Sequence, residues 1–199
     1  IKKEKNHFKL CIKINKFKKC FLVSNNFQSN TYNILAVLAI LSIYFDISKF
    51  NKNIFFKFKA PQGRGDISKI KIFKKNINLI DESYNSNPLS LKSAVLNYDK
   101  IETKKKFKKY LLLGDMLELG NHSKKLHESI APTINNTKID KVYIKGHYMK
   151  YMFKKLSPSK KGQVLSNKSQ IFEFIKNNLN NNDSLMVKAS NATGFNKMI

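Results

Sequence analysis

The sequence predicts an α/β protein built around a mostly parallel β-sheet, and two observations lead to that prediction. In the larger, C-terminal part, short apolar segments that end in polar loops alternate with segments whose apolar residues follow helical spacing. Repeated strand, loop and helix units of this kind favour a parallel sheet with helices on both faces. Pro61, Gly63 and Gly65 form the first clear interruption, so we expect a domain boundary between residues 1–60 and 61–199.

The N-terminal part predicts fewer elements. Residues 9–23 alternate loosely between apolar and basic side chains around a turn near residues 15–16, which is typical of a pair of strands. Residues 34–45 are almost continuously apolar, and we expect a buried helix there, capped near Asn30 or Thr31. The run is shorter than the about 20 residues that a bilayer-spanning helix needs, so we expect no membrane span.

The C-terminal part predicts alternating strands and helices. The expected strands are residues 78–81, 110–113, 141–144, 163–165 and 184–187. The expected helices begin at Asn87-Pro88, cover residues 123–131, 148–155 and 170–179, and start again at Thr193-Gly194. In a parallel sheet, ligands bind where the strands end. The candidate site therefore lies in the loops at residues 81–87, 115–118, 146–147 and 188–191.

Charge is the most prominent compositional feature. The formal net charge is +25, and only one of the 38 basic residues is an arginine. A surplus of this size favours binding to nucleic acid or another polyanion. The lysines are spread over nearly every segment, however, and lysine, asparagine, isoleucine and phenylalanine share AT-rich codons, so codon bias is a sufficient cause. We expect no specific nucleic-acid partner, and a basic α/β module that binds nucleotides or nucleic acid stays the alternative.

The cysteines and histidines show no metal-binding pattern. Cys11 and Cys20 form no CxxC motif, and two reduced thiols in a cytoplasmic protein are the simplest interpretation. The four histidines have no spacing suited to a metal or to general-base catalysis, and His127 is expected to pack inside a helix. We therefore predict no metal ligand and assign no catalytic residue. Lysines interrupt the first 19 residues, which do not resemble a signal peptide.

Arg64 is the only arginine in a chain that otherwise uses lysine for positive charge. Its planar guanidinium offers a fork of donors that fits phosphate or carboxylate in two places at once, which an ammonium group cannot do. Arg64 is therefore a candidate anion-binding residue. The chance retention of one arginine codon is the alternative.

Two acidic loops follow predicted strands. Residues 81–88, DESYNSNP, place two carboxylates, a phenol and several hydroxyl and amide groups together. Such a group can accept hydrogen bonds from ribose hydroxyls and lay an aromatic ring beside a base. A polar turn that only caps the next helix through Asn87 is an equally good interpretation. Residues 113–120, LGDMLELG, allow the same two interpretations.

These segments resemble those of a known family. Residues 81–88 are similar to the DDSYNANP-type signature of the Mur ligases that add D-alanyl-D-alanine, and residues 112–120 are similar to their VLGDMLELG segment. Gly63-Arg64-Gly65 matches the GR that opens the family's C-terminal domain. Residues 33–36 resemble the start of a helix in its central domain, and residues 187–190 resemble a VKGS strand end. All five segments occur in the family's order.

The resemblance implies part of a three-domain, ATP-dependent ligase of cell-wall peptidoglycan synthesis, cytoplasmic and monomeric. Residues 1–60 would be the end of the central ATP-binding domain, and residues 61–199 the Rossmann-like C-terminal domain. Such an enzyme uses ATP and Mg²⁺ to phosphorylate the peptide carboxylate of UDP-N-acetylmuramoyl tripeptide. The amine of D-alanyl-D-alanine then displaces phosphate to form an amide bond.

The resemblance also implies roles for individual residues. Those that would bind the nucleotide are Asn33, Arg64, Asp81, Glu82, Tyr84 and Asn85. Arg64 would reach a phosphate, and one of the two acids would accept a hydrogen bond from ribose. The residues that would lie nearer the dipeptide are Lys188 and Ser190.

Some family features are missing. No GxxGK[ST] phosphate-binding loop occurs in the sequence, and an asparagine, Asn191, follows Ser190 where the family has an arginine. The segments that would supply the Mg²⁺ ligands, and the N-terminal domain, are expected upstream. We therefore expect a fragment or a decayed copy that is inactive alone.

Overall fold

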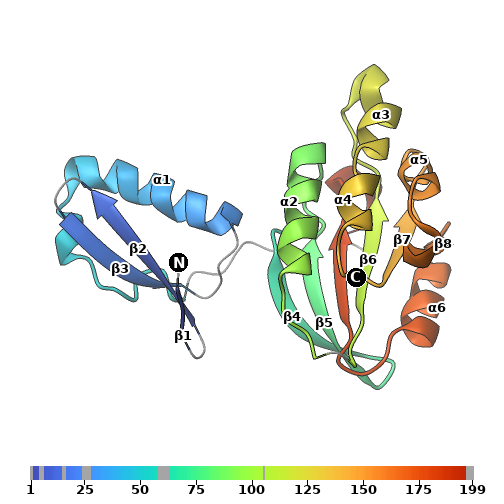
Figure 1. Cartoon of the computed structure of the whole chain (residues 1–199), viewed down its shortest axis with the longest axis horizontal. Coiled ribbons are helices and arrows are strands. Elements are labelled where there is room, and N and C mark those ends of the chain that lie inside the picture. Colours follow the sequence, from blue (N-terminus) through green and yellow to red (C-terminus); the bar gives the residue numbers. More distant parts are fainter. Residues whose placement is uncertain are drawn as a thin grey trace. The chain divides into compact units, whose positions relative to one another are not determined.

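A computed structural model of the chain describes residues 2–4, 7–14, 17–23, 28–57, 63–104 and 106–195. The chain divides into two compact units, Ile1–Ala60 and Pro61–Ile199, here called the N-terminal and C-terminal units (Figure 1). Among the described residues, no helix combines the length and the apolar character needed to cross a membrane.

The N-terminal unit is a three-stranded antiparallel sheet with one long helix. Its elements are β1 (Lys2–Glu4), β2 (His7–Ile14), β3 (Phe17–Val23), α1 (Gln28–Tyr44) and the 3-10 turn η1 (Ile47–Lys49). The predicted strand pair is therefore confirmed. Its core contains the buried side chains Leu10, Ile12, Phe21, Val23, Ile34, Leu38 and Ile47.

Helix α1 contains the predicted apolar run, but most of that run is exposed. The helix begins at Gln28, ahead of the cap expected at Asn30 or Thr31. Ile34 and Leu38, one turn apart, are the buried ones among its described side chains. The large apolar side chains of α1 that are exposed are Tyr32, Leu35, Val37, Ile40, Ile43 and Tyr44. The prediction of a buried helix is wrong for this unit, because a sheet on one side covers only one stripe of a helix that is apolar all round.

Cys11 and Cys20 are joined by a disulfide, so the prediction of two separate thiols is wrong. Strands β2 and β3 pair antiparallel, and Cys11 lies directly opposite Cys20. Both positions are equally far from the turn predicted at residues 15–16, and this symmetry is the signal that would have indicated the pairing.

The C-terminal unit is built on a six-stranded sheet of order β4-β5-β9-β6-β7-β8. Its strands are β4 (Asp66–Ile72), β5 (Lys75–Glu82), β6 (Lys109–Gly114), β7 (Lys141–Lys145), β8 (Lys161–Val164) and β9 (Ser184–Lys188). The edge strand β4 is antiparallel to β5, and the remaining neighbours are parallel. The predicted α/β class with a mostly parallel sheet is confirmed.

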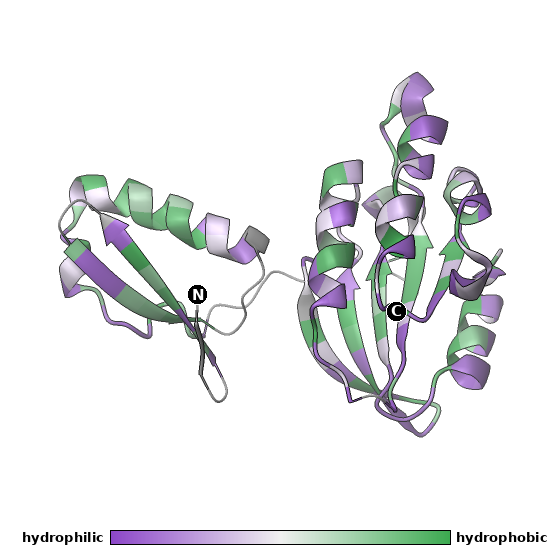
Figure 2. Ribbon diagram, viewed as in Figure 1, coloured by the Kyte–Doolittle hydropathy of each residue, from purple (hydrophilic) through white to green (hydrophobic). Residues whose placement is uncertain are grey.

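Helices cover both faces of this sheet (Figure 1). They are α2 (Pro88–Asp99), α3 (Ser123–Glu128), α4 (Ala131–Asn135), α5 (Met149–Lys154) and α6 (Lys168–Asn178). One core holds side chains of α2, α4 and α5 with Leu111 and Leu113 of β6, and the other holds side chains of α6 with Tyr110 and Leu112. Successive side chains of one strand enter opposite cores, so the central strands are apolar along most of their length and largely green in Figure 2.

The predicted elements and the structure differ at three places in this unit. Strand β4 was not predicted, because lysines interrupt its apolar pattern. The helix expected over residues 123–131 is divided into α3 and α4, and Pro132 lies in the first turn of α4, where its missing N–H is tolerated. The expected helix start at Thr193 is wrong: Thr193 ends the 3-10 turn η4 (Asn191–Thr193), and Gly194 follows with φ 73°.

Candidate functional site

The candidate site forms where three neighbouring parallel strands end. In the sheet register, Lys188 at the end of β9 is paired with Glu82 at the end of β5 and with Leu113 near the end of β6. The loops after these strands therefore meet at one edge of the sheet, as expected for a parallel α/β sheet.

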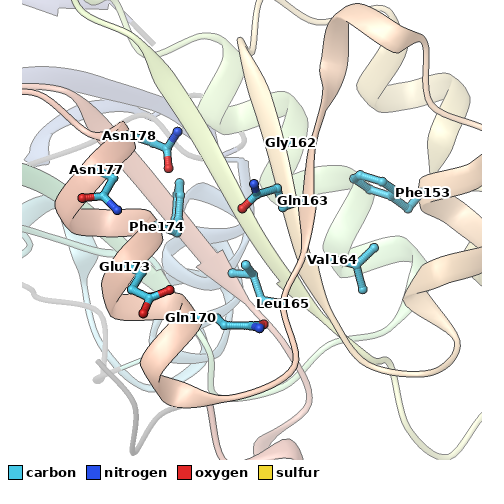
Figure 3. Close-up of a pocket in the computed structure, with 10 residues that line it drawn as sticks. All are labelled: Phe153, Gly162, Gln163, Val164, Leu165, Gln170, Glu173, Phe174, Asn177 and Asn178. Atoms are coloured by element: carbon cyan, nitrogen blue, oxygen red, sulfur yellow. The ribbon is translucent and has the colours of Figure 1, made fainter.

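A hollow of about 330 Å³ lies among these loops. The residues that line it are Tyr84, Asn85, Leu117, Glu118, Ser190, Asn191 and Ala192. A larger open hollow, of about 650 Å³, lies beside edge strand β8 and helix α6 (Figure 3). Exposed amide side chains such as Gln163, Gln170 and Asn177 line it. None of the loops after β5, β6, β7 and β9 lines that larger hollow, so the smaller one is the better candidate site.

The loop after β5 is stabilised by its own side chains. Asp81 Oδ1 accepts hydrogen bonds from the backbone N–H of Ser83 at 2.9 Å and from its hydroxyl at 2.6 Å. Asn87 caps α2 in a capping box with Ser90, as predicted for the start of this helix. The loop is therefore held at both ends, and Tyr84 and Asn85 between them are exposed.

Buried Lys188 and partly buried Glu82 form an ion pair beneath this loop. Lys188 Nζ lies 3.3 Å from Glu82 Oε2 and donates a hydrogen bond to the backbone oxygen of Asn85 at 2.8 Å. Burial raises the pKa of Glu82 and lowers the pKa of Lys188, and the attraction between the two charges opposes both shifts. In both pKa shifts, the unfavourable removal of the charge from water outweighs the attraction between the two charges. The pair therefore fixes the loop at a cost in stability.

Arg64 lies on the aromatic ring of Tyr84. Its guanidinium carbon is 4.1 Å from the ring centre, and the side chain is exposed. The backbone of Tyr84 donates a hydrogen bond to the oxygen of Gly63 at 3.0 Å, and that of Gly65 donates to the oxygen of Asp81 at 2.7 Å. Among the described residues, the guanidinium has no hydrogen-bond partner. Stacking on Tyr84 thus orients the planar guanidinium, and its N–H donors stay available for a ligand.

Gly65 is required beside Glu82. Its φ is +88°, and a Cβ added there would lie 2.9 Å from Glu82 Oε1. A larger residue would therefore strain the backbone and displace the ion pair.

Ser190 joins two of the loops. Its hydroxyl donates a hydrogen bond to the backbone oxygen of Ser86 at 3.2 Å and accepts one from the backbone N–H of Leu117 at 2.9 Å. The Ser190 N–H in turn donates to the backbone oxygen of Asp115 at 3.1 Å. Ser190 therefore sets the spacing between the two walls of the hollow.

The carboxylate of Asp115 is hydrogen-bonded to the protein backbone. It accepts hydrogen bonds from the N–H groups of His147, Tyr148 and Met149, at distances from 2.7 to 3.3 Å. Gly146 has φ +136°, and a Cβ there would lie 2.3 Å from Asp115 Oδ1. Asp115 therefore fixes the loop after β7. Of the two interpretations of residues 113–120, a structural turn or a ligand site, the structural one holds for this acid.

His127 is a packing residue, as predicted. Its side chain is fully buried, Nε2 accepts a hydrogen bond from the backbone N–H of Met116 at 3.0 Å, and Nδ1 lies 2.6 Å from the backbone oxygen of Ser123. The proton is thus on Nδ1, and burial lowers the pKa of His127. The 4.0 Å separation from Asp115 is therefore not an ion pair.

The structure brings most of the predicted site residues together. Those that lie around the hollow or directly against its loops are Arg64, Asp81, Glu82, Tyr84, Asn85, Lys188 and Ser190. Asn33 lies on α1 of the N-terminal unit with an exposed side chain. Within the described ranges, no group of three or more His, Cys, Asp or Glu side chains could hold a metal ion.

Sequence reasoning missed what Asp115 and Lys188 do. It identified both positions as strand-end residues. It did not reveal that both side chains form hydrogen bonds with the backbone of other loops. Leu117 lies inside the predicted loop at residues 115–118, whereas Ala192 was missed, and neither side chain carries a chemical signal of its own. Only the position of their segments after β6 and β9 could have indicated them.

The fold and the hollow define an α/β domain whose candidate site lies at the carboxyl ends of parallel strands. Residues 68–191 match the family described as "Mur ligase, glutamate ligase domain". The chain belongs to the Mur ligase family.

Relatives of known activity are similar over much of the chain. The UDP-N-acetylmuramoyl-tripeptide–D-alanyl-D-alanine ligase of Rickettsia prowazekii (strain Madrid E) is 27% identical over 178 residues, which cover 89% of this chain and 37% of that protein. The ligase of the same name from Bacillus subtilis (strain 168) is 31% identical over 117 residues, covering 57% of this chain and 25% of that protein. The chain thus spans well under half the length of these relatives.

Solved structures show the same fold. The MurF ligase from Thermotoga maritima in complex with ADP superposes with a TM-score of 0.75 at 19% identity, covering 98% of this chain and 43% of that one. A pseudomurein peptide ligase type C from Methanothermus fervidus gives a TM-score of 0.65 at 20% identity, covering 96% and 39%.

Proposed function

We propose that this chain supplies the C-terminal domain, and the end of the central ATP-binding domain, of a ligase that joins D-alanyl-D-alanine to UDP-N-acetylmuramoyl tripeptide in peptidoglycan synthesis. One observation carries the proposal: the DESYNSNP and LGDMLELG segments, which resemble those of such ligases, contribute to the two walls of one hollow. Relatives that carry this activity in their names, and a related structure with bound ADP, support it.

In this proposal Arg64 contacts a phosphate of ATP. The stack on Tyr84 leaves the guanidinium edge exposed, so two parallel donors can meet two phosphate oxygens. Tyr84 is 48% exposed and lies beside Asn85, so its ring and that amide can also meet the nucleoside part of the ligand.

The two acids divide their roles. Glu82 is held by Lys188, and Asp81 uses Oδ1 to accept from Ser83. Among the described residues, Asp81 Oδ2 has no hydrogen-bond partner, so Asp81 is the better acceptor for a ribose hydroxyl. Glu82 would instead orient the loop from below.

Lys188 and Ser190 are proposed to serve the dipeptide side of the site. Lys188 is only 2% exposed, and both side chains are already bonded to neighbouring loops. They therefore act first by setting the positions of those loops. Direct contact with the dipeptide requires an exchange of these bonds, for example when a substrate oxygen replaces the Asn85 carbonyl.

ATP, bound with Mg²⁺, would supply the phosphoryl group that activates the peptide carboxylate. The sequence contains no glycine-rich loop that could surround the β- and γ-phosphates. The isolated chain is therefore expected to bind nucleotide weakly and not to hydrolyse it. Release of ADP that depends on both UDP-N-acetylmuramoyl tripeptide and D-alanyl-D-alanine would contradict this expectation.

Photolabelling with an azido derivative of ATP tests the proposal. The chain is irradiated with the probe at about 150 mM salt, where surface charges are largely screened, and the labelled peptides are mapped. The label is expected in the segment that contains Tyr84 and Asn85, and unlabelled ADP should suppress it. The matched control is Arg64→Gln, which should lose the label without losing the fold.

The high charge gives the alternative a specific basis. A formal net charge of +25 predicts that polyanions adhere to many lysines. In that case the label would spread over lysine-rich peptides of both units, and Arg64→Gln would change nothing. That result would favour a basic binding module without ligase activity.

A further inference from the structure

The solvent face of the β2–β3 hairpin places two cysteines among lysines. In this pair Cys11 lies opposite Cys20, and Lys13 lies opposite Lys18. Because side chains alternate across a strand, residues two apart share a face, so Lys9 and Lys13 flank Cys11. Cys11 is exposed and Cys20 is partly exposed.

The opposite face of the same hairpin holds the core of the N-terminal unit. Leu10, Ile12, Phe21 and Val23 are buried there against Ile34 and Leu38 of α1. Apolar burial and the strand pairing therefore hold the two cysteines in register whether or not they are bonded. The sulfur pair lies outside that core, where solutes reach it.

We propose that Cys11 and Cys20 form a reversible disulfide that is made and broken by exchange with small anionic disulfides, of which glutathione disulfide is the representative. Two features select this class of reagent. The lysines that share this face attract a negatively charged reagent. The pairing of the strands then favours the second step over a stable mixed disulfide.

The exchange takes place in two balanced steps. The thiolate of one cysteine attacks a sulfur of glutathione disulfide, so a protein–glutathione bond forms and one glutathione thiolate leaves. The second cysteine thiolate then attacks the protein sulfur of that mixed disulfide, and the other glutathione thiolate leaves. The two protein thiols are oxidised, one glutathione disulfide is reduced to two glutathiones, and the protons released by the cysteines go to these products.

The disulfide joins the two strands of the hairpin, and its cysteines are nine positions apart in the sequence. Such a cross-link restricts the unfolded N-terminal unit, and it is expected to raise the unfolding temperature of that unit by about 5 to 15 °C. The state of the pair would thus set how firmly the N-terminal unit is folded.

Mass spectrometry of the full chain tests the exchange. The reduced chain is mixed with excess glutathione disulfide, and we expect it to lose two hydrogens and keep no glutathione. Cys20→Ser should instead retain one glutathione on Cys11. A reduced wild-type chain that does not react, or that keeps a glutathione on each cysteine, would overturn the proposal.

A charge variant tests the class of reagent. Replacing both Lys9 and Lys13 by glutamine should slow the reaction with glutathione disulfide about five-fold, but slow that with the uncharged hydroxyethyl disulfide less than about two-fold. The matched control is Lys69→Gln, an exposed lysine on β4 of the other unit, which should alter neither rate. Equal slowing with both reagents would rule out the anionic class.

Discussion

The loops after β5 and β6 flank the end of β9, and each has an acid at its start, in the last residues of β5 and directly after β6, yet the structure uses these acids differently. Asp115 after β6 is buried and accepts three backbone N–H groups from the segment that follows β7. Asp81 at the end of β5 is half-buried and accepts only from Ser83, two residues away. Both loops line the hollow, but Asp115 also ties the loop after β6 to the segment after β7, whereas Asp81 makes only a local contact.

The largest expected effect is a difference between Asp115 and Asp81 in what their removal costs in the free energy of unfolding. Asp115→Ala leaves the N–H groups of His147, Tyr148 and Met149 without their charged acceptor, and we expect a loss of roughly 4 kcal/mol in the free energy of unfolding of the C-terminal unit. Asp81→Ala removes a local turn contact and should cost about 1 kcal/mol. Urea unfolding of the two variants measures the difference. Equal losses would show that the loops do not differ in this way.

The next effect concerns the ion pair between the loops. Lys188→Met leaves Glu82 without its partner, and we expect a loss of about 3 kcal/mol in the free energy of unfolding. Adding Glu82→Gln should recover at least half of it, because no buried charge then remains. If the double variant is no more stable than Lys188→Met, the loss does not come from an unpaired charge on Glu82, and this account of the pair is wrong.

The pH dependence of the stability of Lys188→Met is a second test of the ion pair. Burial raises the pKa of Glu82 above its ordinary value of 4.5, so the folded state favours the protonated acid. The cost of the ionised form therefore appears as pH rises through 4.5 and toward the raised pKa. Without Lys188 this cost grows, so the variant should be closer to wild type in stability at about pH 5 than at about pH 7.

Arg64→Lys tests the loop that faces the hollow. Lysine keeps the charge but loses both the planar fork and the flat stack on Tyr84, so we expect ADP to bind about ten-fold more weakly, with no change in unfolding. The control is Lys69→Arg, an exposed site on β4 that should leave ADP binding unchanged. Unchanged binding in Arg64→Lys would mean that the lone arginine is a codon accident.

The smallest expected effect comes from His127, which supports the loop after β6. Burial lowers the pKa of His127 below its ordinary value of 6.5, so the unfolded state binds the proton more readily. Stability is therefore present above pH 6.5 and is lost as pH falls below it, toward the lowered pKa. The difference should be absent in His127→Gln when both proteins are unfolded in urea at several pH values.

Much of the fold could be predicted because periodic patterns and strand-end loops are local. The strands around β6, β7 and β9 and the capped start of α2 at Asn87 followed from apolar runs and from the preference of asparagine for the cap. Strand β4 could not be predicted in the same way, because its lysines make it resemble a surface loop. It is a strand because β5 supplies its hydrogen-bond partners.

The site was predictable in place but not in detail. Sequence reasoning identified the loops around Tyr84 and Ser190, because parallel strands bring their carboxyl ends together. It could not tell that Lys188 lies inward under the Asn85 carbonyl, since this depends on how far the loop folds over β9. In the same way, the exposed apolar face of α1 could not be distinguished by sequence from a buried one.

Calorimetric titration of the chain with ADP, repeated at about 50 and 200 mM salt, tests the central claim most directly. A site built around Arg64 and Tyr84 predicts one ADP per chain, with an affinity that changes by less than about ten-fold between these salt concentrations because only a few charges meet the ligand. Binding of several ADP molecules per chain, or a loss of a hundred-fold or more over that range, would contradict it. Such a result would mean that the lysines, and not the strand-end loops, bind the nucleotide.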